Sequence, residues 1–382
     1  MKLCQFCTFC AFIGEQAVNF NLWILKNVFD PAPPRCIMNL VMDFNSNLSL
    51  FWRNTHMFEF LIKKLKAHPR KIVFTEGTDA RILEASARLL SGTFLTPVLV
   101  GNVEEIQKVA EDLGFNIRGA EIVDPATFAD MEKMVTALVE LRKGKMTEEQ
   151  ARATLLQGNY FGTMLVKMGY ADALLGGATY STADTVRPAL QIIKTKPGSK
   201  IVSSCFIMVR DAATGDREVL AMGDCAINIA PSAEELAEIG VESARTAKLF
   251  GVDPKVAFLS YSTLGSGKGP DVDKVREAAA MAKAIAPELA IEGELQFDAA
   301  VSPTVARTKC PGNPVAGHAN TFVFPDINAG NIGYKIAQRL GNFDAYGPIL
   351  QGLNAPINDL SRGCNAQEVY SMAIITAGLC ED

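Results

Sequence analysis

Short apolar runs alternate with longer helical patterns along most of this chain, and this alternation limits the possible fold more than any other feature. Residues 71–74 form an apolar run, and residues 78–90 carry apolar side chains at helical spacing. The same pair of patterns returns at residues 97–100 and 103–113. Strands that alternate with helices form parallel sheets covered by helices on both faces. The sequence therefore predicts an α/β protein with mostly parallel, doubly wound sheets.

The alternation continues through a helix that ends at Arg142 and a strand at residues 173–177. Between them, Thr147 and Gln150 have the spacing of a capping box, in which each side chain accepts a hydrogen bond from the backbone of the other residue. We expect one long helix from this box to about Met168.

The pattern changes after residues 197–199, which read Pro-Gly-Ser. Residues 201–209 and 218–222 have strand composition, and residues 214–216 between them are typical of a hairpin turn. Because a hairpin is antiparallel, a second sheet that contains it cannot be purely parallel. We place a domain boundary at this change.

Alternation then resumes to the end of the chain. Ser232 and Glu235 have the spacing of a capping box, and the expected elements are a helix from Ser232 to Phe250, strands at 256–260 and 321–324, helices at 272–285 and 331–340, and a last helix after Cys364. We predict two αβα domains, formed by residues 57–197 with 352–382 and by residues 198–351. A cleft between the domains is the expected ligand site.

Residues 1–56 differ from the rest of the chain. They contain both tryptophans and few charges, and they lack sustained periodicity and the pattern of a secretory signal. An amphipathic helix follows Met57, so we expect Met57 to be the true start and the preceding residues to be non-native. A genuine extension that packs on a partner is the alternative. Cys4, Cys7 and Cys10 have metal-ligand spacing, but no second pair with such spacing follows, so we predict no metal site.

Composition argues against several classes of function. The formal net charge is −5 and no long block of like charges is present, which disfavours binding to nucleic acid or to a membrane surface. No apolar run reaches the ~18–20 residues of a membrane-spanning helix. The nine cysteines are scattered and odd in number, which favours a reducing cytoplasm over a disulfide framework.

Residues 356–364 are polar, lie between two apolar runs and precede the last helix. Backbone N–H groups at a helix start attract anions, Ser361 can donate a hydrogen bond, and Arg362 can hold a phosphate through two bonds. The other interpretation is a helix cap, because Asp, Ser and Asn are common capping residues. These nine residues by themselves favour the cap.

A glycine-rich segment at residues 260–269 follows an expected strand and precedes an expected helix. Its glycines, Gly265 among them, allow backbone N–H groups to face an anion, and Ser262, Thr263 and Ser266 add hydroxyl groups. The segment lacks the first glycine and the final Ser or Thr of a nucleotide-binding P-loop, and it is not a dinucleotide motif. By itself it is most simply a flexible connection.

Several separated motifs together resemble the phosphate acetyltransferase family. The matching segments are residues 75–77, 140–143, 184–188, 293–296, 302–303, 314–317, 324–326, 330–335 and 356–364. Each is weak alone, but their common order over residues 57–381 is specific. The resemblance implies an architecture like that of isocitrate dehydrogenase, a homodimer, and an active site between the domains. It implies neither a metal ion nor a cofactor, with coenzyme A, acetyl phosphate and inorganic phosphate as substrates.

The resemblance also implies roles for particular arginines. Arg81 and Arg142 match arginines that bind coenzyme A phosphates, and Arg187 and Arg362 match arginines nearest the reacting groups. Planar guanidinium groups suit phosphoryl oxygens. Beside the resemblance, the glycine-rich segment becomes a candidate acyl-phosphate site. Its expected substrate-binding residues are Ser262, Thr263, Gly265 and Ser266.

The catalytic pair that the resemblance implies is a serine followed, seven residues later, by an aspartate. Ser361 matches the serine, but Glu368 stands at the second position, with a side chain one methylene longer. In the implied reaction Glu368 takes the proton of the coenzyme A thiol, the thiolate attacks the acetyl carbonyl, and Ser361 donates to the oxyanion. Asp359 is the alternative base.

We therefore predict a cytoplasmic enzyme that interconverts acetyl-CoA plus phosphate with acetyl phosphate plus coenzyme A. A preference for butyryl or another short acyl group is the near alternative, since one methylene in a pocket is worth only ~1–3 kcal/mol. More distant alternatives are a metal-dependent, nicotinamide-linked decarboxylating dehydrogenase and a non-catalytic binding module with the same fold.

Overall fold

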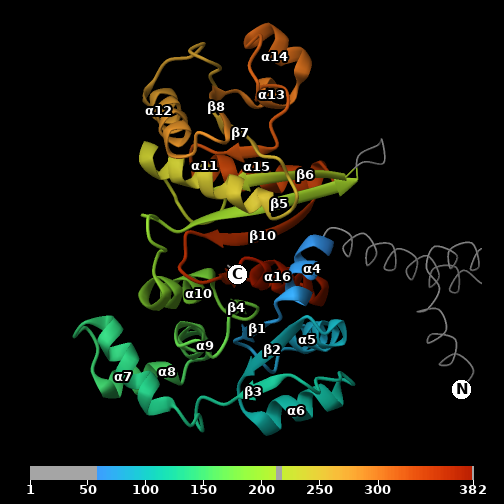
Figure 1. The fold of residues 1–382 in the computed structure, drawn as a ribbon, viewed down its shortest axis with the longest axis vertical. Coiled ribbons are helices and arrows are strands. Elements are labelled where there is room, and N and C mark those ends of the chain that lie inside the picture. The colour runs from blue at the N-terminus through green and yellow to red at the C-terminus, as the bar shows by residue number, and fades with distance from the viewer. Residues whose placement is uncertain (1–57, 212–216, 381–382) are drawn as a thin grey trace, which may run out of the picture. The chain divides into compact units, whose positions relative to one another are not determined.

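The computed structural model describes residues 58–211 and 217–380. The expected start at Met57, the cysteines that precede it and the expected turn at residues 214–216 lie outside the described residues. The chain from Phe60 onwards forms one compact unit, which contains both of the sheets drawn in Figure 1.

The first sheet confirms the predicted parallel arrangement. Its strands are β1 (Arg70–Phe74), β2 (Leu95–Val100), β3 (Glu121–Val123), β4 (Ala173–Gly176) and β11 (Ile357–Asp359). They lie in the order β11-β4-β1-β2-β3, and every neighbouring pair is parallel. Phe74 lies opposite Leu99 of β2 and Leu175 of β4, and all three side chains are buried. Such continuous apolar strands belong inside a sheet that helices cover on both faces.

Side-chain caps mark the starts of some of the helices in this part of the chain. They are α4 (Glu59–Ala67), α5 (Ala80–Gly92), α6 (Val103–Asp112), α7 (Met131–Arg142), α10 (Thr182–Pro188), the short π-helix η1 (Ala189–Ile193) and α16 (Ala366–Gly378). Side-chain oxygens of Asp79 and Asn102 cap α5 and α6. The last helix, α16, packs against both β4 and β10 (Asp344–Gln351), so it lies between the two sheets (Figure 1).

The prediction of a single long helix ending near Met168 is wrong. The predicted capping box of Thr147 and Gln150 is confirmed. The chain forms α8 (Glu148–Leu155), breaks, and continues as α9 (Gly158–Lys167). Gly158 packs on the end of β1, where a Cβ would lie 2.8 Å from the carbonyl oxygen of Thr75. The break therefore brings the start of α9 to the carboxyl end of β1, a contact that helical periodicity does not reveal.

The second sheet is mixed. Its strands are β10, β5 (Ser203–Asp211), β6 (Arg217–Gly223), β9 (Thr321–Val323), β7 (Lys255–Leu259) and β8 (Ala290–Leu295), in that order across the sheet. β5 is antiparallel to both β6 and β10, whereas the other pairs are parallel. Asp211 lies opposite Arg217, which confirms the predicted hairpin. β8 and β10 were not predicted, because β8 is only partly buried and the register of β10 is irregular after Tyr346.

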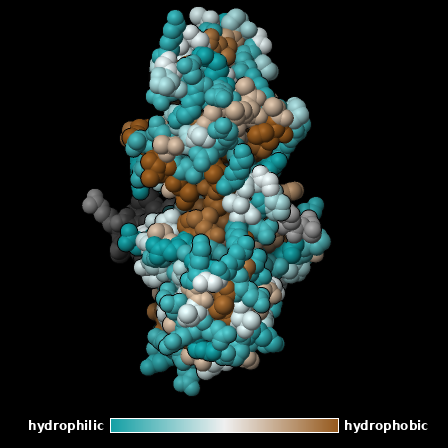
Figure 2. Space-filling model, turned by 90° about the vertical axis from the view of Figure 1, so that its left-hand side faces the viewer, coloured by the Kyte–Doolittle hydropathy of each residue, from teal (hydrophilic) through white to brown (hydrophobic). Residues whose placement is uncertain are grey.

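The helices of the second part are α11 (Ala233–Lys248), α12 (Pro270–Ile285), α13 (Phe297–Val301), α14 (Pro303–Lys309) and α15 (Ile327–Leu340). The predicted capping box of Ser232 and Glu235 begins α11. Hydrophobic side chains gather in the hollow between the parts that contain the two sheets (Figure 2). Within the described ranges, no helix is long and apolar enough to cross a membrane. The division into two domains and the similarity to isocitrate dehydrogenase stay predictions.

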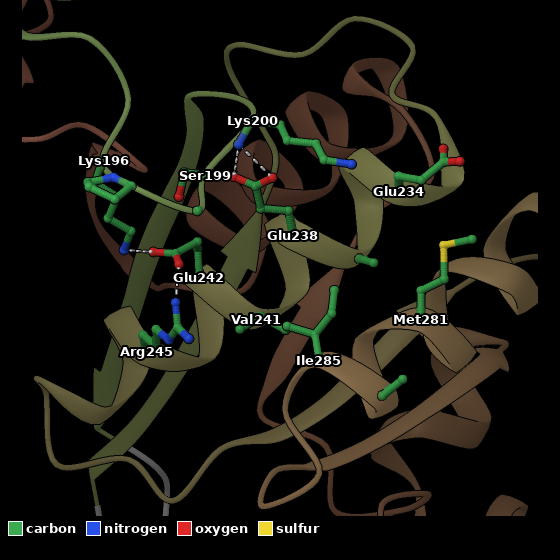
Figure 3. A pocket seen from close by; sticks show the side chains of 14 residues that line it. Lys196, Ser199, Lys200, Glu234, Glu238, Val241, Glu242, Arg245, Met281 and Ile285 are labelled. Atoms are coloured by element: carbon green, nitrogen blue, oxygen red, sulfur yellow. Dashed lines mark hydrogen bonds and ion pairs between the residues drawn. The ribbon is translucent and has the colours of Figure 1, made fainter.

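An ion-pair cluster joins the segment after η1 to α11. Lys196 Nζ lies 2.7 Å from Glu242 Oε2, and Arg245 donates to Oε1 of the same carboxylate (Figure 3). Glu242 is almost fully buried, and a buried carboxylate is tolerated when it is paired in this way. Beside the cluster lies a groove of about 520 Å³. Because Glu242 is already paired with these two cations, we assign the cluster a structural role.

Candidate active site

Three loops meet at the point where the strand order of the first sheet reverses, between β1 and β4. The chain passes from β1 to β2 on one side of the sheet and later returns to β4 on the other side of β1. Ligand sites of open α/β sheets lie at such a switch point, outside the carboxyl ends of the strands. Here a hydrogen bond joins the loops that follow β1 and β4, Arg81 at the start of α5 bonds to the loop after β4, and Thr182 at the start of α10 bonds to the end of β11.

The loops after β1 and β4 are joined by hydrogen bonds between mostly half-buried polar groups. The hydroxyl oxygens of Thr75 and Tyr180 lie 2.5 Å apart, and Glu76 Oε1 accepts hydrogen bonds from the N–H groups of Gly177 and Thr179, both at 3.1 Å. Burial raises the pKa of the Glu76 carboxyl above its ordinary range, although these hydrogen bonds oppose the shift. The cluster fixes the loops and leaves little capacity to bind a ligand.

Asp359, the alternative base, holds α10 in place. Its two oxygens accept hydrogen bonds from Thr182 and Thr185, each at 2.6 Å, and the residue is buried. Burial raises the pKa of Asp359, and the two hydroxyl donors oppose that shift. With both oxygens engaged by α10, Asp359 supports the switch point and is poorly placed to receive a thiol proton.

Ser361 lies on the turn between β11 and α16. The N–H of Cys364 donates to the backbone oxygen of Ser361 at 2.9 Å, and the N–H of Gly363 donates to Ser361 Oγ at 3.2 Å. The Ser361 side chain is exposed, and its own O–H remains available as a donor. Arg362 is also exposed, and its guanidinium has no hydrogen-bond partner within residues 58–211 and 217–380. Burial raises the pKa of Cys364 to about 11, so its thiol is neutral near pH 7.

Glu368 lies in the first turn of the last helix and lines the same groove as Ser361. Asn365 and Glu368 form a capping box, with Glu368 Oε2 accepting from the N–H of Asn365 at 3.0 Å. The cap is therefore Asn365, which follows residues 356–364, and the interpretation of those residues themselves as the helix cap is wrong. The carboxylate of Glu368 is exposed.

A groove of about 440 Å³ brings the expected catalytic pair together with two cations. Ser361 and Glu368 line it from the first part of the molecule, whereas Lys335, Arg339 and Tyr346 line it from α15 and β10. Its wall also contains Phe206 and Tyr334, whose rings stack at 4.1 Å. Cations opposite a serine and a carboxylate suit a substrate that carries phosphoryl groups.

Lys335 and Arg339 were not predicted as site residues. The signal was present, because two cations four residues apart lie on the same face of a helix. Only the packing of α15 against β5 and β10 shows that this face borders the Ser361 turn.

The glycine-rich segment folds inward on Glu294. Ser262 is fully buried, and its hydroxyl donates to Glu294 Oε1 at 2.9 Å and accepts from the N–H of Gly267 at 2.8 Å. The N–H of Gly265 donates to the same Glu294 oxygen at 2.6 Å. Burial by itself would raise the pKa of Glu294. Arg276 and these donors outweigh burial and hold that pKa below its ordinary range.

Two further members of the segment bond to each other. The N–H of Thr263 donates to Ser266 Oγ at 2.9 Å. None of Ser262, Thr263, Gly265 and Ser266 lines the groove that contains Ser361. Their contact with substrate stays a prediction.

The other predicted arginines occupy different surroundings. Arg187 on α10 is 58% exposed and lies 3.9 Å from Asp184, so its guanidinium is largely free to bind an anion. Arg142 ends α7, and its buried Nε has no hydrogen-bond partner in the described part of the chain. Arg81 instead binds the turn of Ser361, donating to the backbone oxygens of Arg362 and Cys364. No group of three or more potential metal ligands is found among the described residues.

Comparison with known proteins gives a consistent result. The family model described as phosphate acetyl/butaryl transferase matches residues 56–377. Phosphate acetyltransferase of Bacillus subtilis (strain 168) is 57% identical over 321 residues, which are 84% of this chain and 98% of that protein.

Two solved structures are similar as well. A phosphotransacetylase from Streptococcus pyogenes is 57% identical with a TM-score of 0.81, covering 85% of this chain and 97% of that one. EutD phosphotransacetylase from Staphylococcus aureus is 51% identical with a TM-score of 0.80, covering 85% and 98%.

Proposed function

The chain belongs to the phosphate acetyl/butaryl transferase family, and from this premise we propose that it transfers an acetyl group between coenzyme A and inorganic phosphate. The reaction converts acetyl-CoA and phosphate to coenzyme A and acetyl phosphate, and it is reversible. The observation that carries the proposal is the groove in which Ser361 and Glu368 face Lys335 and Arg339, in a chain 57% identical to a phosphate acetyltransferase.

The proposed mechanism uses Ser361 and Glu368 of the groove together with Arg187 and Arg362, two exposed arginines that do not line it. Glu368 accepts the proton of the coenzyme A thiol, and the thiolate attacks the acetyl carbonyl of acetyl phosphate. Ser361 donates its hydroxyl hydrogen bond to the oxyanion that develops, and inorganic phosphate leaves. Arg362 and Arg187 hold the phosphoryl group, and the cations of α15 add positive charge. The substrates supply every reacting group, so the proposal includes no cofactor.

Thiolysis of acetyl phosphate by coenzyme A, followed by thioester absorbance, tests this function. We expect turnover with the chain from Met57 to Asp382 and loss of turnover in Ser361→Ala. Propionyl and butyryl phosphate in the same assay measure acyl preference, which the family description leaves open between acetyl and butyryl groups. Absence of turnover with all three acyl phosphates would overturn the proposal.

We also propose a homodimer that pairs through α15. Ile332, Ile336 and Leu340 recur every four residues on this helix and are 58%, 53% and 80% exposed. Beside them lies a groove of about 650 Å³ whose lining is largely apolar. A contiguous apolar surface of this kind marks an interaction site, and a second copy of the chain can cover it with the same face.

A cytoplasmic location completes the proposal. The five cysteines of the described residues, at positions 205, 225, 310, 364 and 380, are all free and buried. Free thiols suit a reducing compartment.

A further inference from the structure

Arg81 has no hydrogen-bond donor left for a substrate. Its Nε donates to Asp79 Oδ1 at 3.0 Å, and Nη2 donates to Asp79 Oδ2 at 2.7 Å and to the backbone oxygen of Ala178 at 2.9 Å. Its Nη1 donates to the backbone oxygens of Arg362 and Cys364, at 2.9 and 3.1 Å. A guanidinium carries five N–H donors, so each one has a protein acceptor.

The two carbonyls that Arg81 holds belong to the turn that carries Ser361. That turn has few other anchors: within it, Cys364 bonds to the backbone of Ser361 and Gly363 bonds to its hydroxyl. Arg81 donates hydrogen bonds to the turn at Arg362 and Cys364. Its own position is held by the carboxylate of Asp79, which caps α5. Through Ala178 it also binds the loop after β4. One side chain therefore joins three segments of the switch point.

We infer that Arg81 is a positioning residue, which fixes the turn of Ser361 and Arg362 in its reactive geometry and does not bind a phosphate of coenzyme A. This inference rests on the proposed function. It differs from the role that the sequence resemblance implies for Arg81, because a phosphate ligand needs N–H donors that face solvent. The side chain is only 27% exposed.

Steady-state kinetics separate the two roles. In Arg81→Ala we expect kcat to fall ~10²-fold while the KM for coenzyme A changes by less than about twofold, since small displacements of reacting groups have costs of that size. Arg81→Lys should recover little, because an ammonium group cannot reproduce a planar fork that reaches one carboxylate and three carbonyls. Added guanidinium ion should restore part of the kcat of Arg81→Ala.

Arg152→Ala is the matched control. Arg152 also grips a carboxylate, that of Glu132, but it joins α8 to α7 and does not contact the turn. We expect its kinetics to equal those of the wild type. A rise of about tenfold or more in the KM of Arg81→Ala for coenzyme A, with kcat unchanged and with no such rise for 3′-dephospho-coenzyme A, would make Arg81 a phosphate ligand and overturn the inference.

Amide hydrogen exchange provides a measurement that does not depend on turnover. We expect the N–H groups of Gly363 and Cys364 to exchange faster in Arg81→Ala than in the wild type and in Arg152→Ala. Equal protection in all three proteins would overturn the inference. If the wild type fails to transfer acetyl groups, the proposed function fails, and the exchange experiment still decides whether Arg81 holds the turn.

Discussion

Glu368 accepts a hydrogen bond from the backbone N–H of Asn365 at 3.0 Å, so the expected general base is also part of the capping box of α16. A substitution at this position therefore changes two properties at once. Gln separates them, because a capping box accepts Gln as well as Glu at its third position, whereas an amide cannot take a proton from a thiol.

We expect Glu368→Gln to lower kcat for acetyl phosphate thiolysis by ~10²–10⁴-fold, the usual contribution of a general base. Its melting temperature should stay close to that of the wild type. Glu235→Gln is the control, because Glu235 occupies the same position of the capping box of α11. Activity that survives Glu368→Gln would assign the base to another group.

Ser262→Ala should destabilise the fold without weakening substrate binding. The substitution removes one of the hydrogen bonds to Glu294 and leaves the buried N–H of Gly267 without its Ser262 acceptor, and such losses cost ~1–3 kcal/mol. Urea denaturation measures the free energy of unfolding, and Ser91→Ala, at an exposed hydroxyl, serves as the control. A variant of unchanged stability whose KM for acetyl phosphate rises would show instead that Ser262 binds substrate.

Asp359 should make stability depend on pH in a defined direction. Burial raises the pKa of Asp359 in the folded protein, so the folded state keeps a proton that the unfolded state releases. The stabilisation is complete below the ordinary Asp pKa of ~3.9 and is lost as pH rises through the raised value. In urea titrations at a series of pH values above about 3.9, the free energy of unfolding of Asp359→Asn should fall less with rising pH than that of the wild type.

Burial also raises the pKa of the Glu76 carboxyl. The free energy of unfolding of Asp359→Asn should therefore still fall with rising pH, but less steeply than that of the wild type. Asp112→Asn, at the exposed end of α6, is the matched Asp→Asn control. Identical pH dependence in Asp359→Asn and the wild type would contradict the prediction.

The apolar face of α15 predicts how the chain assembles. Asp in place of Ile336 puts a charge in the centre of the proposed dimer contact, and we expect Ile336→Asp to sediment as a monomer at concentrations where the wild type is a dimer. Leu156→Asp, at another exposed apolar residue, is the control and should not change the sedimentation coefficient. A wild-type monomer, or an Ile336→Asp dimer, would exclude this interface.

Local signals predicted much of the fold. The alternation of apolar runs and helical periods gave the parallel first sheet, and the capping boxes at Thr147 and Ser232 marked the starts of two helices. The break between α8 and α9 escaped prediction because its cause is a contact with Thr75, more than 80 residues earlier in the chain. The strands β8 and β10 escaped because irregular register and partial burial remove the alternation on which strand prediction depends.

The family, the order of most elements, and the positions of Ser361, Arg362 and Glu368 on a segment that enters the last helix could be predicted from the sequence. Each of these predictions rests on motifs whose own residues lie close together in the chain. What each side chain faces could be learned only from the folded structure. In that structure every N–H donor of Arg81 binds a protein acceptor, and Ser262 turns inward to Glu294. Lys335 and Arg339 come to the groove of Ser361. The physical reason is that hydrogen-bond partners and burial are set by residues distant in sequence, which local patterns do not encode.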